Sequence, residues 1–261
     1  GKRTRSMDTV KEQMNLIRGF ELQLVWHLFP PGGRILEIGA GSGYQASRIK
    51  EQGFQVEAIE VNLHSKKIFD VKKYDGKTIP FPDHYFDIVF SSNVLEHIEG
   101  VEDFQEEIKR VLKPNGCGIH ILPTATWRFW SWLTHCANWF KIIYKLAFGL
   151  VKTKDSLNSD PEMVMKTKKA MKQLGLLGLV REKLLIAPHG VRGNAFTEAY
   201  YFSRYFWIPF FKRTGWKLIS YYPSHLFYTD SITFGIYLKL KYRQILSYIL
   251  GSACIVYIVK K

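Results

Sequence analysis

Hydrophobic and polar positions follow two different periods along the first half of the chain. Over residues 9–28, apolar side chains such as Val10, Met14 and Ile17 recur at roughly helical spacing, which predicts a helix. Residues 34–39 form a short apolar run bounded by glycines, the pattern of a buried strand in a parallel sheet. Strands that alternate with helices imply βαβ units, so we expect an α/β fold around a doubly wound parallel sheet. The other predicted elements are helices over 44–52 and 101–113, a turn at Pro114-Asn115-Gly116, and strands over 55–61, 86–94 and 116–123.

The regular alternation ends at Pro123. Residues 124–150 are largely apolar and contain four tryptophans, and a Lys-rich, helix-prone connection over 151–185 follows them. A helix is predicted over 196–215, with an interruption at Pro209, and Gly251-Ser252 separates a short apolar helix from a β-branched closing strand. We read that helix and strand as core. We therefore expect three parts: an N-terminal helix and core over 1–123, a helical, basic and aromatic insertion over 124–195, and a C-terminal part over 196–261 that completes the sheet.

Composition narrows the class of protein. The chain has 261 residues, of which 46% are hydrophobic and 23% charged, which argues against intrinsic disorder and against a polytopic membrane protein. Its three cysteines, Cys117, Cys136 and Cys254, show no CxxC spacing, which argues against a disulfide scaffold and a zinc site. The first ten residues lack the apolar stretch of a signal peptide, so we expect a reducing, cytoplasmic setting.

The formal charge of +14 is unevenly distributed along the chain. Residues 1–110 carry 15 basic and 17 acidic side chains, whereas residues 111–261 carry 22 basic and 6 acidic ones. Aromatic residues also gather in the second half, in stretches such as WRFWSW and AYYFSRYFW. This pattern indicates a nearly neutral core joined to a basic, aromatic surface that contacts another molecule.

A glycine-rich turn follows the first predicted strand. Gly39, Gly41 and Gly43 lie where that strand gives way to a helix, and glycines there let a ligand approach the backbone beside a helix N-terminus. The spacing is GxGxG, not the GxGxxG of dinucleotide-binding enzymes, and the sequence has no GxxxxGK[ST] phosphate-binding loop. Glu37 stands two positions before the first glycine, and its carboxylate suits a cationic ligand better than a pyrophosphate.

Two more acidic residues stand at informative places. Glu60 ends the second predicted strand, where a carboxylate can accept both hydroxyls of a ribose, and Asp75 precedes the third. Four stretches, LEIGAGSG, AIE, YDGKTIPFPDHYFDIVFSSNVLEHI and IKRVLKPNGCGIHILP, together resemble the class I S-adenosylmethionine-dependent methyltransferases, the type-11 branch in particular. The resemblance covers roughly residues 34–123.

The resemblance implies a Rossmann-like sheet of seven strands whose last strand, ACIVYIVKK, is antiparallel, with the insertion between strands 5 and 6. It also implies S-adenosylmethionine as the cofactor and S-adenosylhomocysteine as the product. The site residues that it implies are Glu37 with the turn Gly39, Gly41 and Gly43 for the methionine portion, Glu60 for the ribose, Asp75 with the Gly76 backbone for the adenine amine, and Ser92 and Asn93 for the methionine or the acceptor.

Histidines are the candidates for proton transfer, because an imidazole can accept a proton near neutral pH. His97, in LEHI, is either a base or a packing residue at a helix start, and His120, between apolar neighbours, is read as a core residue. His189, in the loop PHGVRGN, is the first candidate for the base; the alternative is a solvated loop before a capped helix. The HG…GN…E pattern and TATWRFW also loosely resemble methyltransferases of bacterial cell-surface glycan and lipid biosynthesis. The candidates for contact with an acceptor are Arg192, Asn194, Glu198 and Trp127.

The stretch 124–150 has three interpretations. It is long enough to span a bilayer at about 1.5 Å per residue, but Arg128, His135, Lys141 and Lys145 are dispersed through it, and a central charge is costly in hydrocarbon. Tryptophans with interleaved basic residues are typical of a helix in the headgroup plane, or of a lid over an apolar acceptor. We favour the interfacial helix over the buried lid, and both over a transmembrane span.

The sequence therefore predicts an enzyme that transfers a methyl group from S-adenosylmethionine to an acceptor hydroxyl. We expect the acceptor to be a small molecule, a lipid-linked sugar or another amphiphile, met at the anionic inner face of a membrane. No metal-ligand cluster is visible, so we expect a metal-independent reaction. Two rival functions stay open: methylation of RNA or DNA through the basic half, although no [DN]PP[YF] motif occurs, and a non-catalytic protein that keeps the cofactor-binding fold.

Overall fold

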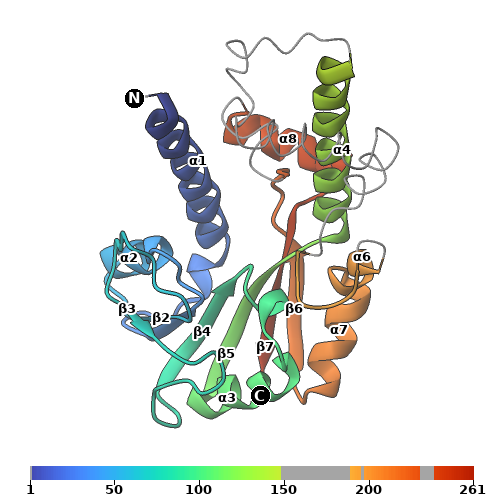
Figure 1. The fold of residues 1–261 in the computed structure, drawn as a ribbon. Helices are drawn as coiled ribbons and strands as arrows, with labels where there is room; N and C mark the ends of the chain where they lie inside the picture. Colours follow the sequence, from blue (N-terminus) through green and yellow to red (C-terminus); the bar gives the residue numbers. More distant parts are fainter. Residues whose placement is uncertain (1, 148–188, 195–196, 230–237) are drawn as a thin grey trace.

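A seven-stranded mixed sheet forms the centre of the molecule (Figure 1). The computed structural model describes residues 2–147, 189–194, 197–229 and 238–261. The order across the sheet is β3-β2-β1-β4-β5-β7-β6, and β7 is antiparallel to both of its neighbours, while the other pairs are parallel. The predicted α/β fold, with seven strands and an antiparallel last strand, is confirmed. The strands are β1 (Arg34–Ile38), β2 (Gln55–Glu60), β3 (Val71–Lys73), β4 (Phe86–Ser92), β5 (Leu112–Pro123), β6 (Lys217–Pro223) and β7 (Cys254–Lys260).

Helices cover both faces of this sheet. Helices α1 and α2 pack on one face through a core that includes Leu22 and Ile49, and α3 and α7 pack on the other through Phe104 and Trp207. The helices are α1 (Lys2–Val25), α2 (Tyr44–Glu51), α3 (Val101–Val111), α4 (Ala125–Ala147), α6 (Glu198–Tyr201), α7 (Arg204–Arg213) and α8 (Leu240–Leu250), with 3₁₀ turns η1 (Trp26–Leu28) and η2 (Leu95–His97).

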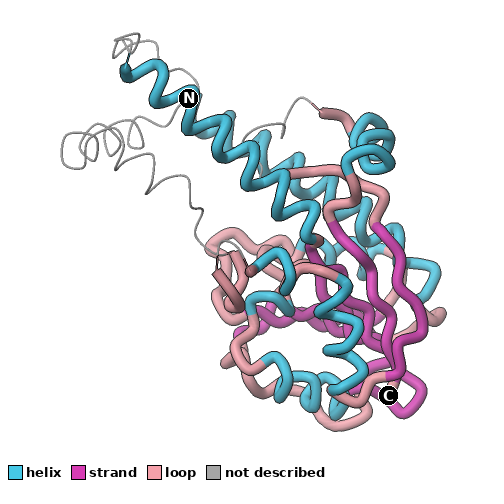
Figure 2. Tube along the Cα trace, turned by 90° about the vertical axis from the view of Figure 1, so that its right-hand side faces the viewer, coloured by secondary structure: helices cyan, strands magenta, loops and turns pink. Residues whose placement is uncertain are grey.

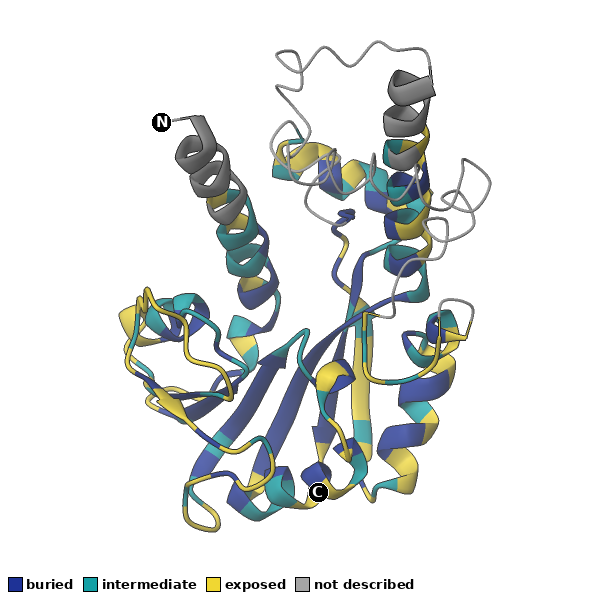
Figure 3. Cartoon of the chain, in the orientation of Figure 1, coloured by how far each residue is buried: buried dark blue, intermediate teal, exposed yellow. Residues whose placement is uncertain are grey.

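The central strands are buried from both sides, and Figure 3 shows them in dark blue. Neighbouring positions Ile35 and Leu36 of β1 point to opposite faces, and both have no exposed surface. A parallel strand covered on both faces has an apolar run without alternation, which explains why RILEI was readable as a strand.

Two predicted boundaries are wrong. Strand β5 continues through the predicted Pro114-Asn115-Gly116 turn: its pairing jumps from Phe86 opposite Leu112 to Ile88 opposite Cys117, so the extra residues bulge from the ladder. Pro209 lies inside α7 and does not end it. That helix buries four aromatic side chains against the sheet, and this burial outweighs the hydrogen bond that proline cannot donate.

Helices α1 and α4 extend beyond the same end of the sheet, and α8 lies beside α4 (Figure 1). The side view in Figure 2 also shows helix reaching well past the strands. Most of the predicted insertion, including the connection over 151–185, lies outside the described residues. Among those described, no helix has both the length and the hydropathy that a bilayer crossing requires. The reading of the apolar stretch before Gly251 as core is wrong for α8, because Ile245 and Ile249 are 51% and 77% exposed.

Candidate active site

The glycine turn lies between β1 and α2, at the point of the sheet where β1 separates β2 from β4. Gly39 has φ 70°, and a Cβ there would lie 2.3 Å from Cγ2 of Val94, so the turn and the end of β4 pack closely only with glycine. A Cβ on Gly41 would meet only Nε2 of His64, at 3.7 Å. The backbone at Gly41 is therefore open to a ligand, at the position where doubly wound sheets bind theirs.

Glu37 lies beneath this turn with an unsatisfied carboxylate oxygen. It is 3% exposed, and its Oε2 has no hydrogen-bond partner among the described residues. Burial raises the pKa of Glu37 to about 8, and the nearby carboxylate of Glu60 raises it further, against the lowering effects of a hydrogen bond from the Ala46 backbone and of the Arg18 charge. A cation bound at Oε2 would favour the ionised carboxylate, as the sequence predicted for this residue.

Glu60 links the end of β2 to the glycine turn. Its Oε2 accepts the N–H of Gly41 at 2.9 Å, and its Oε1 accepts the N–H of Val61 at 2.8 Å. Asp75 is held differently: one carboxylate oxygen accepts the backbone N–H groups of Thr78 and Lys77, both at 2.8 Å, and these bonds lower the pKa of Asp75. Both acids are thus fixed at the same edge of the sheet as the turn.

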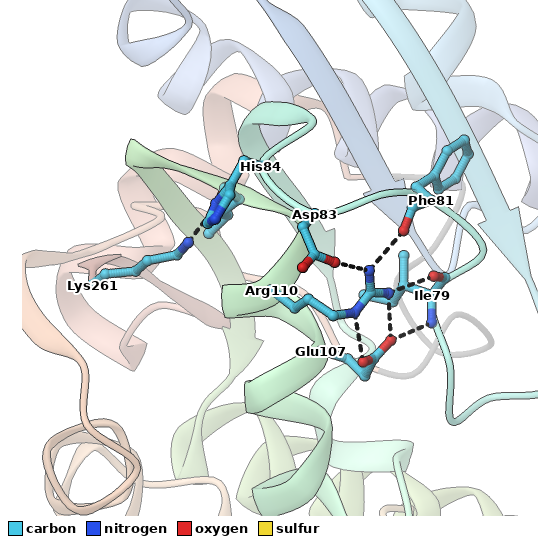
Figure 4. A network of polar contacts seen from close by, with 8 residues as sticks. Ile79, Phe81, Asp83, His84, Glu107, Arg110 and Lys261 are labelled. Carbon is cyan, nitrogen blue, oxygen red and sulfur yellow. Dashed lines mark hydrogen bonds and ion pairs between the residues drawn. The ribbon is translucent and has the colours of Figure 1, made fainter.

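The segment after Asp75 is anchored by Arg110 of α3, as Figure 4 shows. Its guanidinium donates to the carbonyl oxygens of Ile79 and Phe81 at 2.8 Å each. It also pairs with the carboxylates of Glu107 and Asp83, again at 2.8 Å. One planar fork therefore sets the path of the chain between β3 and β4, which includes Gly76, at φ 81°.

Ser92 and Asn93 belong to a polar network that sequence reasoning missed. The hydroxyl of Ser92 donates to Glu21 of α1 at 3.2 Å, and Asn93 donates to the same hydroxyl at 3.2 Å. Glu21 is buried, pairs with Arg18 at 2.6 Å and accepts the hydroxyl of Tyr228 at 2.7 Å. Glu21 lies 71 residues from Ser92 and 207 residues from Tyr228 along the chain, so no local pattern marked this network.

The two histidines considered separately as bases lie together. The ring centroids of His97 and His189 are 4.8 Å apart, and Trp127 packs on His189 at the same centroid distance. The loop that carries His189 is pinned to η2, because Val191 donates its N–H to the carbonyl oxygen of Glu96 at 3.0 Å. A Cβ on Gly190 would lie 2.8 Å from that oxygen, so this approach requires glycine.

The remaining acceptor candidates have partners within the protein. Glu198 has no exposed surface; its carboxylate accepts the N–H groups of His189 and, at 2.7 Å, Gly190, and it pairs with Nε of Arg128 at 2.5 Å. Arg192 pairs with Glu102 of α3. Asn194 accepts the N–H of Thr197 at 3.0 Å, just before α6 begins. These contacts make Glu198 a positioning residue for the loop. The prediction that its carboxylate contacts an acceptor is therefore wrong.

Two other polar side chains, His120 and Glu96, are buried near the end of β4 or beside it. His120 is buried in β5, bonded to the hydroxyl of Ser91 at 2.8 Å, and burial lowers its pKa to about 3. This is the core position that the sequence predicted. Glu96, next to His97, was not singled out; its side chain is 2% exposed, and neither carboxylate oxygen has a hydrogen-bond partner among the described residues. Burial raises the pKa of Glu96 to about 8.

The part of the chain that carries the glycine turn, Glu60 and Asp75 is similar to known methyltransferases. Residues 36–119 match the family model Methyltransf_11, described as a methyltransferase domain. This part of the chain is therefore similar to the methyltransferase domains that depend on S-adenosylmethionine. Solved S-adenosylmethionine-dependent methyltransferases from Archaeoglobus fulgidus and Mesorhizobium loti are similar in fold to this chain, with TM-scores of 0.53 and 0.51. They cover 95% and 93% of this chain, which covers 94% and 98% of theirs, at 14% and 12% identity.

The curated relatives match about a third of this chain. An uncharacterized methyltransferase of Mycobacterium leprae is 35% identical over 37% of this chain and 39% of its own length. A sterol 24-C-methyltransferase of Schizosaccharomyces pombe is 33% identical over 33% of this chain and 26% of its own. A ubiquinone biosynthesis O-methyltransferase of Rickettsia typhi is 33% identical over 33% of this chain and 39% of its own. The chain thus spans about two fifths or less of these relatives.

The site fits S-adenosylmethionine, the cofactor of this family. The cofactor carries a sulfonium and an ammonium group, and Glu37 offers a buried, unpaired carboxylate oxygen beside a turn whose backbone is open. Glu60 and Asp75 lie at the edge where a ribose and an adenine would extend from that point. The donor set is therefore complementary to the charge of the cofactor.

Proposed function

We propose that this protein transfers the methyl group of S-adenosylmethionine to an acceptor hydroxyl. The observation that carries the proposal is Glu37, whose buried carboxylate has an unpaired oxygen beneath the open glycine turn. Bound S-adenosylmethionine supplies a methyl group attached to a positively charged sulfonium sulfur. When the acceptor oxygen forms a bond to the methyl carbon, the sulfur–methyl bond breaks and the sulfur is left as a neutral sulfide. The protein then has to bind the donor, align the acceptor, exclude water and receive one proton.

His189 is the first candidate to receive the hydroxyl proton, and His97 is the second. Both imidazoles lie on the wall formed by η2 and the loop 189–194, next to the end of β4. Burial and the neighbouring His189 hold the pKa of His97 below its usual value, so this imidazole is neutral near pH 7 and able to accept a proton. Trp127 packs on His189 and offers an aromatic wall for an acceptor.

We also propose that the acceptor is a lipid-linked sugar or another amphiphile at an anionic membrane surface. Exposed apolar side chains on two neighbouring helices support this, together with the excess of basic residues in the second half of the chain. Neither α4 nor α8 contains an acidic residue, so their surfaces do not repel an anionic lipid. The exposed residues are Phe129, Trp132, Leu133 and Phe140 on α4, and Tyr242, Ile245, Tyr248 and Ile249 on α8.

Transfer of a labelled methyl group into a membrane lipid or glycan extract, followed by mass spectrometry of the product, tests the activity. His189→Ala should slow turnover and leave the affinity for S-adenosylhomocysteine unchanged, whereas Glu60→Ala should weaken that affinity. Glu57→Ala is the matched control, because Glu57 lies on the same strand but pairs with Lys72 at 2.8 Å. Equal losses of turnover and affinity in both test variants would contradict the assigned roles.

Membrane binding has a separate test. The protein should float with anionic liposomes at low salt, and Ile249→Glu should abolish flotation without loss of S-adenosylhomocysteine binding. If the protein ignores liposomes but binds bulk RNA with a steep salt dependence, the acceptor is a nucleic acid. If calorimetry detects no S-adenosylhomocysteine binding, the protein is a non-catalytic homologue.

A further inference from the structure

Three side chains with metal-ligating atoms meet between η2 and the loop 189–194. The ligand atoms of Glu96, His97 and His189 all lie within 4.8 Å of one another. Nε2 of His97 is 3.7 Å from Oε1 of Glu96, and the two imidazole centroids are 4.8 Å apart. Two imidazoles and one carboxylate form a ligand set that binds Zn²⁺ and non-haem Fe²⁺ and leaves coordination positions open.

Glu96 gives a second and independent indication of a bound cation. Its side chain is 2% exposed, and neither carboxylate oxygen has a hydrogen-bond partner among the described residues. A buried carboxylate is strongly destabilised unless a cation or a donor pairs with it. The nearby Arg18 does not meet this need, because its guanidinium already pairs with Glu21 at 2.6 Å.

The surrounding structure holds the third ligand in place. The loop of His189 is joined to η2 by the bond from Val191 to the carbonyl oxygen of Glu96, at 3.0 Å. The carboxylate of Glu198 accepts the backbone N–H groups of His189 and its neighbour, and Arg128 of α4 pairs with that carboxylate. Such support from outside the ligand set fixes ligand orientation in metal sites.

We propose that Glu96, His97 and His189 bind a divalent first-row transition-metal ion. Imidazole nitrogens suit Zn²⁺, Fe²⁺, Ni²⁺ and Cu²⁺ and are poor ligands for Mg²⁺ and Ca²⁺, which take oxygen. The three residues come from two segments separated by 92 positions, which is why the sequence showed no metal-ligand spacing. The proposal differs from the metal-independent reaction that the sequence led us to expect.

The inferred ion deepens the proposed methyl transfer, and its role at the acceptor rests on that function. Three protein ligands leave a position in which the acceptor hydroxyl can bind the ion. The ion lowers the pKa of that hydroxyl, and the proton leaves to solvent. An imidazole nitrogen that holds the ion cannot take the same proton, so in the metal-bound protein His97 and His189 are ligands and not bases.

Cobalt binding tests the site without any methyl transfer. Untagged protein, stripped with a chelator, is titrated with Co²⁺ while the visible d–d absorption is followed. We expect saturation at one ion per chain, and loss of the absorption when Zn²⁺ displaces Co²⁺. Glu96→Gln and His189→Ala should each weaken the affinity by roughly tenfold or more, whereas His27→Ala, an exposed histidine of η1 outside the cluster, should not change it.

Two results would overturn the proposal: the absence of saturable binding at one ion per chain, or wild-type affinity in Glu96→Gln. Circular dichroism and S-adenosylhomocysteine calorimetry on the same variants separate loss of the site from loss of the fold. These readouts also separate the two proposals. A protein that binds Co²⁺ but not S-adenosylhomocysteine keeps the metal site and loses the methyltransferase function, and the reverse pattern removes only the metal site.

Discussion

Replacement of Glu37 by glutamine should change how the stability of the cofactor-free protein depends on pH. Burial raises the pKa of Glu37 from 4.5 to about 8. The folded protein therefore holds the proton more tightly than the unfolded chain does. The stability that this proton provides is fully present below pH 4.5 and is lost as the pH rises to about 8.

The size of the effect follows from the width of that interval. At about 1.4 kcal/mol per pH unit, the interval from 4.5 to about 8 corresponds to roughly 5 kcal/mol of unfolding free energy. Glutamine keeps the shape of the side chain and does not ionise. The free energy of unfolding of the wild type, relative to that of Glu37→Gln, should therefore fall by several kcal/mol between about pH 5 and about pH 8.5.

Denaturant unfolding of both proteins at a series of pH values measures this difference, and groups common to both, such as His120, cancel from it. Glu57→Gln is the control, because Glu57 lies on the neighbouring strand and pairs with an exposed lysine. S-adenosylhomocysteine, whose ammonium can pair with the carboxylate, should stabilise the wild type more at high pH than at low pH, and this dependence should be absent in Glu37→Gln. Parallel pH profiles of wild type and Glu37→Gln would refute the reasoning.

Three further substitutions test how the site is built. Gly39→Ala should lower the affinity for S-adenosylhomocysteine by roughly tenfold or more in calorimetry, because the new Cβ would lie 2.3 Å from Val94; unchanged affinity would show that the turn can shift. Glu198→Gln should lower the unfolding free energy by about 1.5–3 kcal/mol, because it removes the negative charge that pairs with the buried Nε of Arg128; a loss below about 1 kcal/mol would exclude that role. Arg110→Lys should cost about 1–3 kcal/mol in the same measurement, since lysine cannot reproduce the fork between two carbonyls and two carboxylates, and wild-type stability would contradict it.

The elements that the sequence predicted correctly have local causes. The strand RILEI is apolar throughout because β1 is covered on both faces, and the glycine turn after it needs positive φ angles that mark it in the sequence. The turn predicted at Asn115 is wrong because its cause is not local. Its residues have turn propensity, but the pairing of β5 with β4 on either side keeps them in a bulged strand.

Some residues of the candidate site could also be proposed from local sequence, whereas others depend on packing between distant segments. Glu37, Glu60 and Asp75 could be proposed from the sequence because each lies close to the carboxyl end of a strand, and the carboxyl ends of neighbouring parallel strands meet at one edge. The buried position of Glu21 against Ser92 has no local counterpart, because it depends on how α1 packs across the sheet. The exposure of α8 could not be predicted from the sequence either, because the apolar composition of this segment resembles that of a core helix.

The sequence by itself determined the alternation of strands and helices and the type of fold, and it predicted the cofactor edge, because local periodicity, glycine conformation and strand ends are properties of short segments. Only the tertiary structure decided that His97, Glu96 and His189 share one place. That meeting depends on a loop held by the buried pair of Glu198 and Arg128, and contacts between distant segments leave no periodic pattern in the chain.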